Sequence, residues 1–347
     1  MTKAQRLLLF CAALLLLPAV LYAGKPTPTP TPTPPPDGSK IFYDRFDIAT
    51  YFSMNSDGSQ KAALPANVYG VPSHTRHGGH FWFLEARAVG GNTIDGLRPR
   101  YELFAVRDDD SYTVQLTNDW TLELKVVDQK LPVASWTPGD QQASWVATRV
   151  DAAGAPVKGG IWSGPVTVDT NGNVTGPITI PTEPLVPLAL LGGTPDIYGW
   201  PFSWAPGFNQ VVYNDGARHM MVYTINPAGR QQILDHGDHP NWSPAGNRIV
   251  FNDARGIVTV NTDGTSPLVI VAGGGKTGGA GAGQCADGLY NPHYSPDGSY
   301  VVFFHTVPIK PPSYCLERTE YVDRCRSTGG SVTHLTTNGG PIDGWSN

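Results

Sequence analysis

One short pattern recurs in a fixed order along most of this 347-residue chain. In its clearest copies, 239–251 and 291–304, an aromatic residue is followed by Ser-Pro, a Gly-containing turn and a run of β-branched and aromatic residues. Looser copies cover 202–213, 134–147 and 72–84. Recurrence of this kind is typical of architectures in which each repeat is one supersecondary unit. The repeat therefore constrains the fold more than any single residue does.

Each unit is predicted to form four antiparallel strands. In Ser-Pro-Asp-Gly at 295–298 the proline presets φ and the glycine accepts a positive φ, so the first strand ends in a tight turn. A second and a third strand follow, and a Gly-containing hairpin at 56–58, 227–229 or 262–264 leads to the fourth. Four-stranded units that repeat radially and stack on each other form a β-propeller.

The two ends of the repeat region complement each other. Five units have their own first strand, near residues 72, 134, 202, 240 and 292. The segment 40–44 resembles a second strand without a first, and 343–346 resembles a first strand with nothing after it. We predict an all-β, six-bladed propeller of four-stranded antiparallel blades, closed by pairing of the N- and C-terminal half-blades, which removes free sheet edges. An open, incomplete array is the alternative.

The repeat resembles those of the TolB propeller and its relatives. The resemblance rests on the pattern Pro-x-Trp-Ser-Pro-Asp-Gly-x-x-Ile-x-Phe, which 240–251 and 291–304 match closely, and on the later Asp-Gly hairpin. It spans 39–347 and implies the propeller fold. TolB carries a small α/β domain ahead of its propeller, whereas this chain has a Thr-Pro spacer there, so we expect a TolB-like propeller that is not TolB itself.

The residues before the repeat predict export. A positively charged start and an apolar run at 7–17 make 1–23 a predicted signal peptide, with an uncleaved anchor helix as the alternative. Alternating Thr and Pro predict an extended linker at 24–38, ahead of the propeller at 39–347. We expect a periplasmic or secreted protein that has no membrane span after cleavage, and a closed propeller is expected to be monomeric.

Composition limits the classes of partner. The formal net charge is −5, and it becomes −7 when a signal peptide containing Lys3 and Arg6 is removed. The sequence contains no basic tract, which argues against nucleic acid as a partner. It also lacks a Gly-x-Ser-x-Gly elbow, a His-Glu-x-x-His helix and a phosphate-binding loop, so no catalytic residues are predicted.

Polar residues that align between the units are candidates for the mouth of the central channel. A small or polar residue precedes the aromatic residue of each unit. We predict binding residues at Ser73, Ser135, Ser203, His239, Asn241 and His293. Simple channel lining is the alternative for most of them. The aromatic column that follows is expected to pack between blades.

The densest polar cluster is 235–239, and it suggests a metal. His236, His239 and, from the neighbouring blade, His293 could together hold a divalent ion. Oligogalacturonate lyases, propellers with related repeats and a histidine-bound metal, resemble this arrangement. Solvated or turn-bonded histidines are the alternative, in which case no cofactor is predicted.

Export also permits a disulfide. Cys285 lies in the Gly-rich insertion 272–290 and Cys315 in the loop 307–318, two loops expected on the same face of a propeller. We therefore predict Cys285–Cys315 and leave Cys325 as the odd thiol. Cys315–Cys325 is the alternative.

Two functions of different classes follow. The first is an exported binding module on a Pro-Thr stalk, which recognises a protein, peptide or glycan of the cell envelope at its loop face or channel mouth. The alternative is a metal-dependent propeller enzyme, such as an oligogalacturonate-lyase-like polysaccharide lyase or a hydrolase. A purely structural envelope protein is a third option.

Overall fold

The computed structural model describes residues 38–45, 50–73, 76–92, 99–127, 131–198, 202–273, 288–308, 318–339 and 342–346. The predicted signal peptide, nearly all of the linker, and both cysteines of the predicted disulfide lie outside these ranges. Within them, no helix is long and apolar enough to cross a membrane. The helical element they contain is the short 3-10 turn η1 (Pro138–Asp140).

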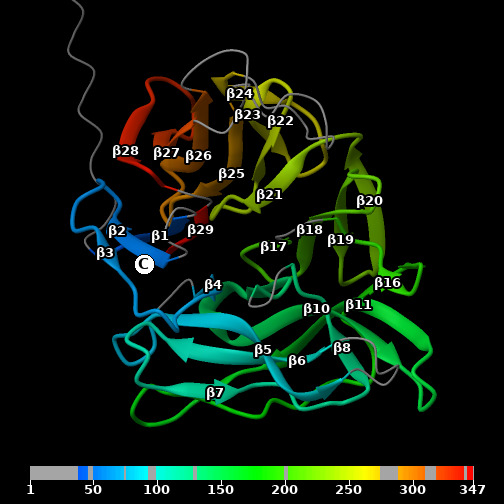
Figure 1. Ribbon diagram of the computed structural model, residues 1–347. Coiled ribbons are helices and arrows are strands. Elements are labelled where there is room, and N and C mark those ends of the chain that lie inside the picture. Colours follow the sequence, from blue (N-terminus) through cyan, green and yellow to red (C-terminus); the bar gives the residue numbers. More distant parts are fainter. Residues whose placement is uncertain are drawn as a thin grey trace, which may run out of the picture. The chain divides into compact units, whose positions relative to one another are not determined.

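Six sheets of four or five strands form blades arranged in a ring, and two further two-stranded sheets are described below (Figure 1). The first blade orders β29 (Ile342–Ser346), β1 (Lys40–Arg45), β2 (Thr50–Asn55) and β3 (Ala62–Ala63). The second orders β4 (Val71–Pro72), β5 (Trp82–Asn92), β6 (Pro99–Arg107) and β7 (Thr113–Gln115). The fourth orders β17 (Ser203–Trp204), β18 (Gln210–Asn214), β19 (Met220–Thr224) and β20 (Gly229–Leu234). The fifth orders β21 (Asp238–Trp242), β22 (Arg248–Asp253), β23 (Gly256–Asn261) and β24 (Leu268–Ala272). The sixth orders β25 (Gly288–Tyr294), β26 (Tyr300–Pro308), β27 (Arg318–Arg326) and β28 (Thr333–Thr337). The chain is a six-bladed β-propeller.

The third blade departs from the regular pattern. Its inner position is shared by β8 (Leu122–Leu124) and β9 (Ala134–Trp136), which pair with successive parts of β10 (Gln142–Val150). The blade continues with β11 (Pro156–Pro165) and β14 (Val186–Leu188). Two small hairpins are added, β12 (Thr167–Val168) with β13 (Val174–Thr175) and β15 (Leu190–Leu191) with β16 (Thr194–Pro195). The blade is still four strands wide, although five strands form it.

The predicted first strands and the predicted hairpin turns are confirmed. β4, β17, β21 and β25 begin the second, fourth, fifth and sixth blades where the repeat predicted them, and β9 of the third blade also lies at its predicted place, although β8 precedes it. The two half-blades share one sheet, because β29 pairs antiparallel with β1, with Ile41 opposite Trp345 and Phe42 opposite Gly344. The first blade therefore combines strands from the two ends of the repeat region.

The core lies between the blades. Six buried hydrophobic clusters each join two successive blades, including one that joins the sixth blade to the first. The predicted packing of the aromatic column is confirmed at Trp136, Trp204, Trp242 and Tyr294, which are all buried in these clusters. The side chains of its other members, His74 and Trp345, lie outside the part of the chain that the structure describes. Each large aromatic ring buried between sheets removes a large apolar area from water and so stabilises the core.

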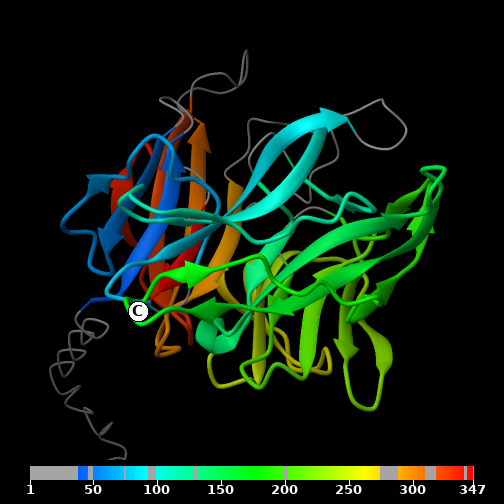
Figure 2. The same ribbon diagram turned by 90° about the horizontal axis from the view of Figure 1, so that it is seen from below.

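The antiparallel order of each blade gives the ring two unlike faces. The loops between second and third strands, and the connections from each fourth strand to the next blade, leave from the same edge, which we call the connection face. The tight hairpins leave from the opposite edge, the hairpin face. In Figure 2 the long strands β5 and β6 extend on the same side as the end of β26. Propeller loops on one face are where function concentrates.

Two glycines with the same backbone angle allow a test of the blade packing. Gly256 and Gly330 both have φ +125°, but a Cβ on Gly256 would lie 2.1 Å from the backbone oxygen of Val271, whereas one on Gly330 would meet nothing within 4 Å. We expect Gly330→Ala to lower the free energy of unfolding by about 1–2 kcal/mol, through backbone strain alone. Gly256→Ala should cost roughly 2 kcal/mol more because of the clash. Urea denaturation of the two variants measures the difference, and equal losses would contradict the close approach of Gly256 to β24.

Candidate functional site

The predicted column of polar residues mainly joins neighbouring blades. Trp242 N donates a hydrogen bond to Ser203 Oγ (3.1 Å), which links the fifth blade to the fourth. Tyr294 N donates to Asn241 Oδ1 (3.1 Å), which links the sixth blade to the fifth. The same position in successive repeats therefore performs the same structural task. A ligand-binding role for Ser203 and Asn241 stays a prediction.

The other predicted members of the column, Ser73, Ser135 and His293, are buried. Ser73 Oγ accepts from Trp82 N (2.9 Å) within the second blade, and Ser135 Oγ donates to Trp136 O (2.9 Å). His293 is only 8% exposed. A ligand-binding role for Ser73, Ser135 and His293 stays a prediction.

A bulge at the start of two first strands places polar side chains on strained backbone. His239 in β21 and Asn291 in β25 occupy equivalent positions and have φ +55° and +52°. In both strands the register with the second strand shifts at this point. Non-glycine residues at positive φ cost of order 1–3 kcal/mol and are concentrated at functional sites. The bulges of β21 and β25 therefore make their surroundings a candidate for the functional site.

His239 is held in one tautomer by the neighbouring strand. Its Nδ1 lies 3.1 Å from Asn252 Oδ1, which also accepts from Asn291 N (3.3 Å). Because an amide oxygen only accepts, His239 donates from Nδ1 and keeps a lone pair on Nε2. Desolvation lowers the pKa of His239, while Asp238 and the contact with Asn252 oppose the shift. The neutral imidazole is therefore favoured, which is the form that accepts a proton or binds a metal.

Three further side chains complete a polar cluster beside His239 on the connection face. Arg218 lies in the turn between β18 and β19, and its guanidinium carbon is 4.1 Å from the ring centre of Tyr198. Its Nη1 lies 3.9 Å from Asp238 Oδ2, and its Nη2 donates to the Tyr198 hydroxyl. Arg218 also has a positive φ, +69°. We call Tyr198, Arg218, Asp238 and His239 the mouth cluster.

The exposure of the mouth cluster suits ligand contact. The side chain of Arg218 is 27% exposed and Tyr198 is 41% exposed, whereas the side chain of Asp238 is only 11% exposed. A buried carboxylate thus anchors a guanidinium whose outer side reaches solvent beside an aromatic ring. Sequence reasoning found His239 but missed Tyr198 and Arg218, because both lie in inter-strand connections that do not share the repeat pattern.

The three predicted metal ligands do not form a group in the structure. His236 is exposed, His239 is half-buried and His293 is buried. Among the described residues, two other sets have ligand atoms that all lie within 4.8 Å of one another: His305, Asp323 and His334, and His80, Asp108 and Asp109. Metal binding by His236, His239 and His293 stays a prediction.

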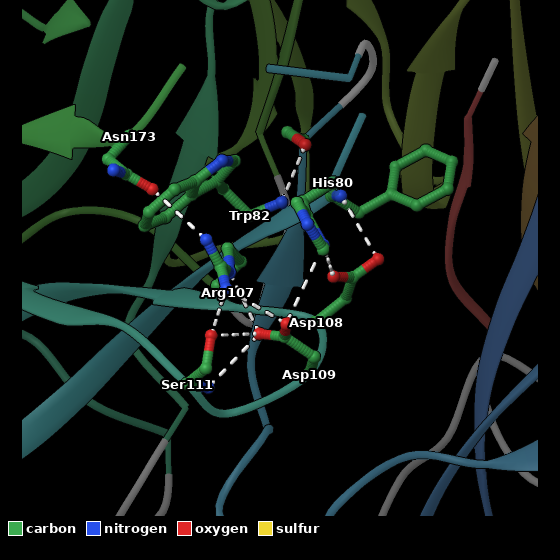
Figure 3. A network of polar contacts seen from close by, with 9 residues as sticks. His80, Trp82, Arg107, Asp108, Asp109, Ser111 and Asn173 are labelled. Carbon is green, nitrogen blue, oxygen red and sulfur yellow. Dashed lines mark hydrogen bonds and ion pairs between the residues drawn. The ribbon is translucent and has the colours of Figure 1, made fainter. Parts of the chain in front are cut away.

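The His80 set is a structural network on the hairpin face (Figure 3). His80 Nδ1 lies 2.8 Å from Asp108 Oδ1, while both oxygens of Asp109 accept from Arg107, at 2.8 and 3.0 Å. Hydrogen bonding from Arg107 holds the pKa of Asp109 well below its usual range. Arg107 Nη1 also donates to Asn173 Oδ1 (3.1 Å), in the turn between β12 and β13. Asp109 therefore ties the second blade to an insertion of the third through Arg107.

A polar hollow of about 470 Å³ lies on the second blade. Its lining includes Asn67, Glu85, Arg87, Tyr101 and Asp110. Its volume is within the range of small-molecule sites. Arg87 Nε and Nη2 both donate to the buried Glu85 Oε2, at 3.0 and 2.8 Å, so the strongest charges of the hollow neutralise each other. In the mouth cluster, by contrast, Arg218 lies 3.9 Å from Asp238, which is too long for a hydrogen bond, so its donors are not used by that carboxylate.

The cysteine predictions are tested only at Cys325. The structure records its thiol as free and buried. Burial, with a smaller contribution from Asp323, raises the pKa of Cys325 to about 12. A thiol of this kind is unreactive because the thiolate is the nucleophile. The Cys285–Cys315 bridge stays a prediction.

Comparison by sequence finds no matching family model and no matching curated protein. Among solved structures, similarity extends to a putative TolB from Agrobacterium tumefaciens (16% identity, TM-score 0.48, 88% of this chain and 92% of that one). It extends also to TolB from Acinetobacter baumannii (12%, 0.45, 83% and 65%) and to an oligogalacturonate lyase in complex with manganese (12%, 0.40, 86% and 72%). With TM-scores below 0.5, these likenesses do not bear on function. The predicted propeller fold is confirmed by the sheet topology itself.

Proposed function

We propose that the chain is an exported binding module that recognises an acidic group of a peptide or glycan at the mouth cluster. The observation that carries the proposal is the half-exposed Arg218, held by stacking on Tyr198 and by the charge of Asp238. At 3.9 Å the contact with Asp238 is longer than a hydrogen bond, so it orients the guanidinium without using its donors.

The donor count favours an anionic ligand. A guanidinium has five N–H donors, and among the described residues Arg218 donates to the Tyr198 hydroxyl alone. The remaining donors match the planar, bidentate geometry of a carboxylate. The exposed ring of Tyr198 adds an apolar surface against which a sugar or a peptide side chain can pack.

The test is a binding screen of immobilised uronic-acid oligosaccharides, their neutral counterparts, and peptides with acidic ends. Arg218→Ala should weaken binding of the acidic ligand by about 30-fold or more, because it removes one partner of a desolvated charge pair. Arg255→Ala is the matched control, since Arg255 lies on the same face but pairs with Asp253. Equal binding by Arg218→Ala and the unaltered protein would refute the proposal.

A metal-dependent enzyme is the second candidate function. It is favoured by one observation, the neutral His239 with its Nε2 lone pair beside Asp238. This candidate would be supported by a stoichiometric divalent metal that His239→Ala loses, together with cleavage of an acidic polysaccharide. If the His239→Ala variant retains the metal, this candidate function is excluded.

A further inference from the structure

Three neighbouring strands of the sixth blade bring together two histidines and an aspartate away from the mouth cluster. Asp323 in β27 pairs in register with His334 in β28, and His305 in β26 pairs with Tyr321, two residues along β27. Side chains two apart on a strand share a face. The three side chains therefore point to one face of the blade, the face whose residues Phe303 and Cys325 pack against the fifth blade.

The carboxylate at the centre of this group is fully buried. The side chain of Asp323 is 0% exposed, and its two oxygens are taken by different imidazoles, Oδ2 by His305 Nδ1 at 2.8 Å and Oδ1 by His334 Nδ1 at 2.6 Å. His305 is 20% exposed and His334 is 59% exposed, so the group opens to solvent on the side of the outermost strand. The ring of Tyr321 lies 4.7 Å from that of His334.

We propose that His305, Asp323 and His334 bind one divalent transition-metal ion such as Zn²⁺ or Co²⁺. Two imidazole nitrogens and one carboxylate oxygen suit these ions, whereas Ca²⁺ and Mg²⁺ favour all-oxygen sites. The three donor atoms lie within 4.8 Å of one another. Metal–ligand bonds of about 2.0–2.2 Å require donor atoms no more than roughly 4.2 Å apart. Rotation of the exposed His334 side chain would bring its nitrogen within this distance of the other two donor atoms.

The proton balance of binding is simple. Without metal, a hydrogen bond joins Nδ1 of each imidazole to one oxygen of Asp323. The ion takes the place of the hydrogens of these two bonds, and each ring stays neutral by carrying its proton on Nε2, which it exchanges with solvent. Three protein donors leave open coordination positions for water on the side of His334. The site depends on neither Arg218 nor His239, so it is independent of the proposed ligand site.

The test titrates the purified chain with Co²⁺ alone and follows the visible ligand-field absorption. We expect one ion per chain, displaced by Zn²⁺ and not by Mg²⁺. His334→Ala should weaken binding by more than about 100-fold, the upper end of the effect of outer-shell changes. Because His334 is exposed on an outer strand, the variant should keep its fold, as checked by circular dichroism. Asp323→Asn tests the buried ligand in the same way.

The matched control is His219→Ala. His219 is likewise paired through Nδ1 with an aspartate, Asp215 at 3.0 Å, but within the described ranges it belongs to no three-residue group of metal-ligating side chains. It should bind Co²⁺ like the unaltered protein. The proposal is overturned if the chain binds no Co²⁺, if His219→Ala and His334→Ala lose binding equally, or if His239→Ala abolishes binding while His334→Ala retains it. The last outcome would place the ion at the mouth.

Discussion

A chain that lacks residues 341–347 should lose its cooperative folded state. The deletion removes β29 and leaves the first blade with three strands and an open inner edge. It also removes Ile342, fully buried in the cluster between the sixth and first blades, and its carbonyl, which accepts from Asn291 Nδ2. Loss of a buried isoleucine alone costs about 2–5 kcal/mol, and lost ladder hydrogen bonds add about 1 kcal/mol each.

The sum is about 5 kcal/mol or more, which is comparable with the whole stability of a typical domain. Urea denaturation followed by circular dichroism and tryptophan fluorescence gives the measurement. The control is removal of Asn347 alone, which leaves β29 complete. If the shortened chain unfolds at the same urea concentration as the control, β29 is not part of the cooperative unit, and the predicted closure of the ring by half-blade pairing is wrong.

The blades could be predicted from the sequence because local turn chemistry specifies them. The glycines of the third-to-fourth hairpins, such as Gly58 and Gly264, have φ +86° and +85°, as the turns require. A Pro-containing turn recurs after β9, β17, β21 and β25, so the order of these strands follows from the order of the turns. In the third blade the first strand near residue 134 was predicted, but the additional strand β8 was not, because only its pairing with β10 reveals it.

The site residues depend on features that a sequence does not display. Asp323 meets His334 and His305 through cross-strand register, which is set by pairing and not by spacing along the chain. Arg218 lies in the turn between β18 and β19, and Tyr198 lies in the connection from the third blade to the fourth, so their contact joins segments that the repeat does not relate. His236 and His239 were grouped because they lie three residues apart, and His293 because it begins the neighbouring blade, yet the three differ in burial: His236 is exposed, His239 half-buried and His293 buried. Alignment of the repeats thus predicts where the strands lie, but it does not predict which side chains meet.

Replacing Asn252 with alanine should destabilise the propeller and disturb His239. Asn252 is 1% exposed, and its Oδ1 is the acceptor for both Asn291 N and His239 Nδ1. Alanine leaves both donors without this acceptor, and each buried unsatisfied donor costs about 1–3 kcal/mol. Because the bond from Asn291 is long, we expect a loss of about 2–4 kcal/mol in the free energy of unfolding. Urea denaturation measures it, and a loss below about 1 kcal/mol would show that Asn252 does not join the blades.

The pH dependence separates the packing role of Asn252 from its effect on His239. Desolvation places the pKa of His239 below its ordinary value of 6.5, so the unfolded chain binds more protons between these two values. The contribution of the neutral His239 to stability is therefore fully present above about pH 6.5, and it is lost as the pH falls from 6.5 towards the pKa of His239 in the folded state. The contact with Asn252 raises the pKa of His239, and Asn252→Ala removes it. We therefore expect this variant to lose more free energy of unfolding on acidification than the unaltered protein. Asn252→Asp keeps an acceptor and adds a negative charge that, with Asp238, favours the imidazolium against Arg218, so its loss should be smaller. Urea midpoints at about pH 5 and about pH 8 test this order, since both lie outside the ordinary titration of histidine. If the aspartate variant is as acid-sensitive as the alanine variant, His239 does not control the acid stability of this region.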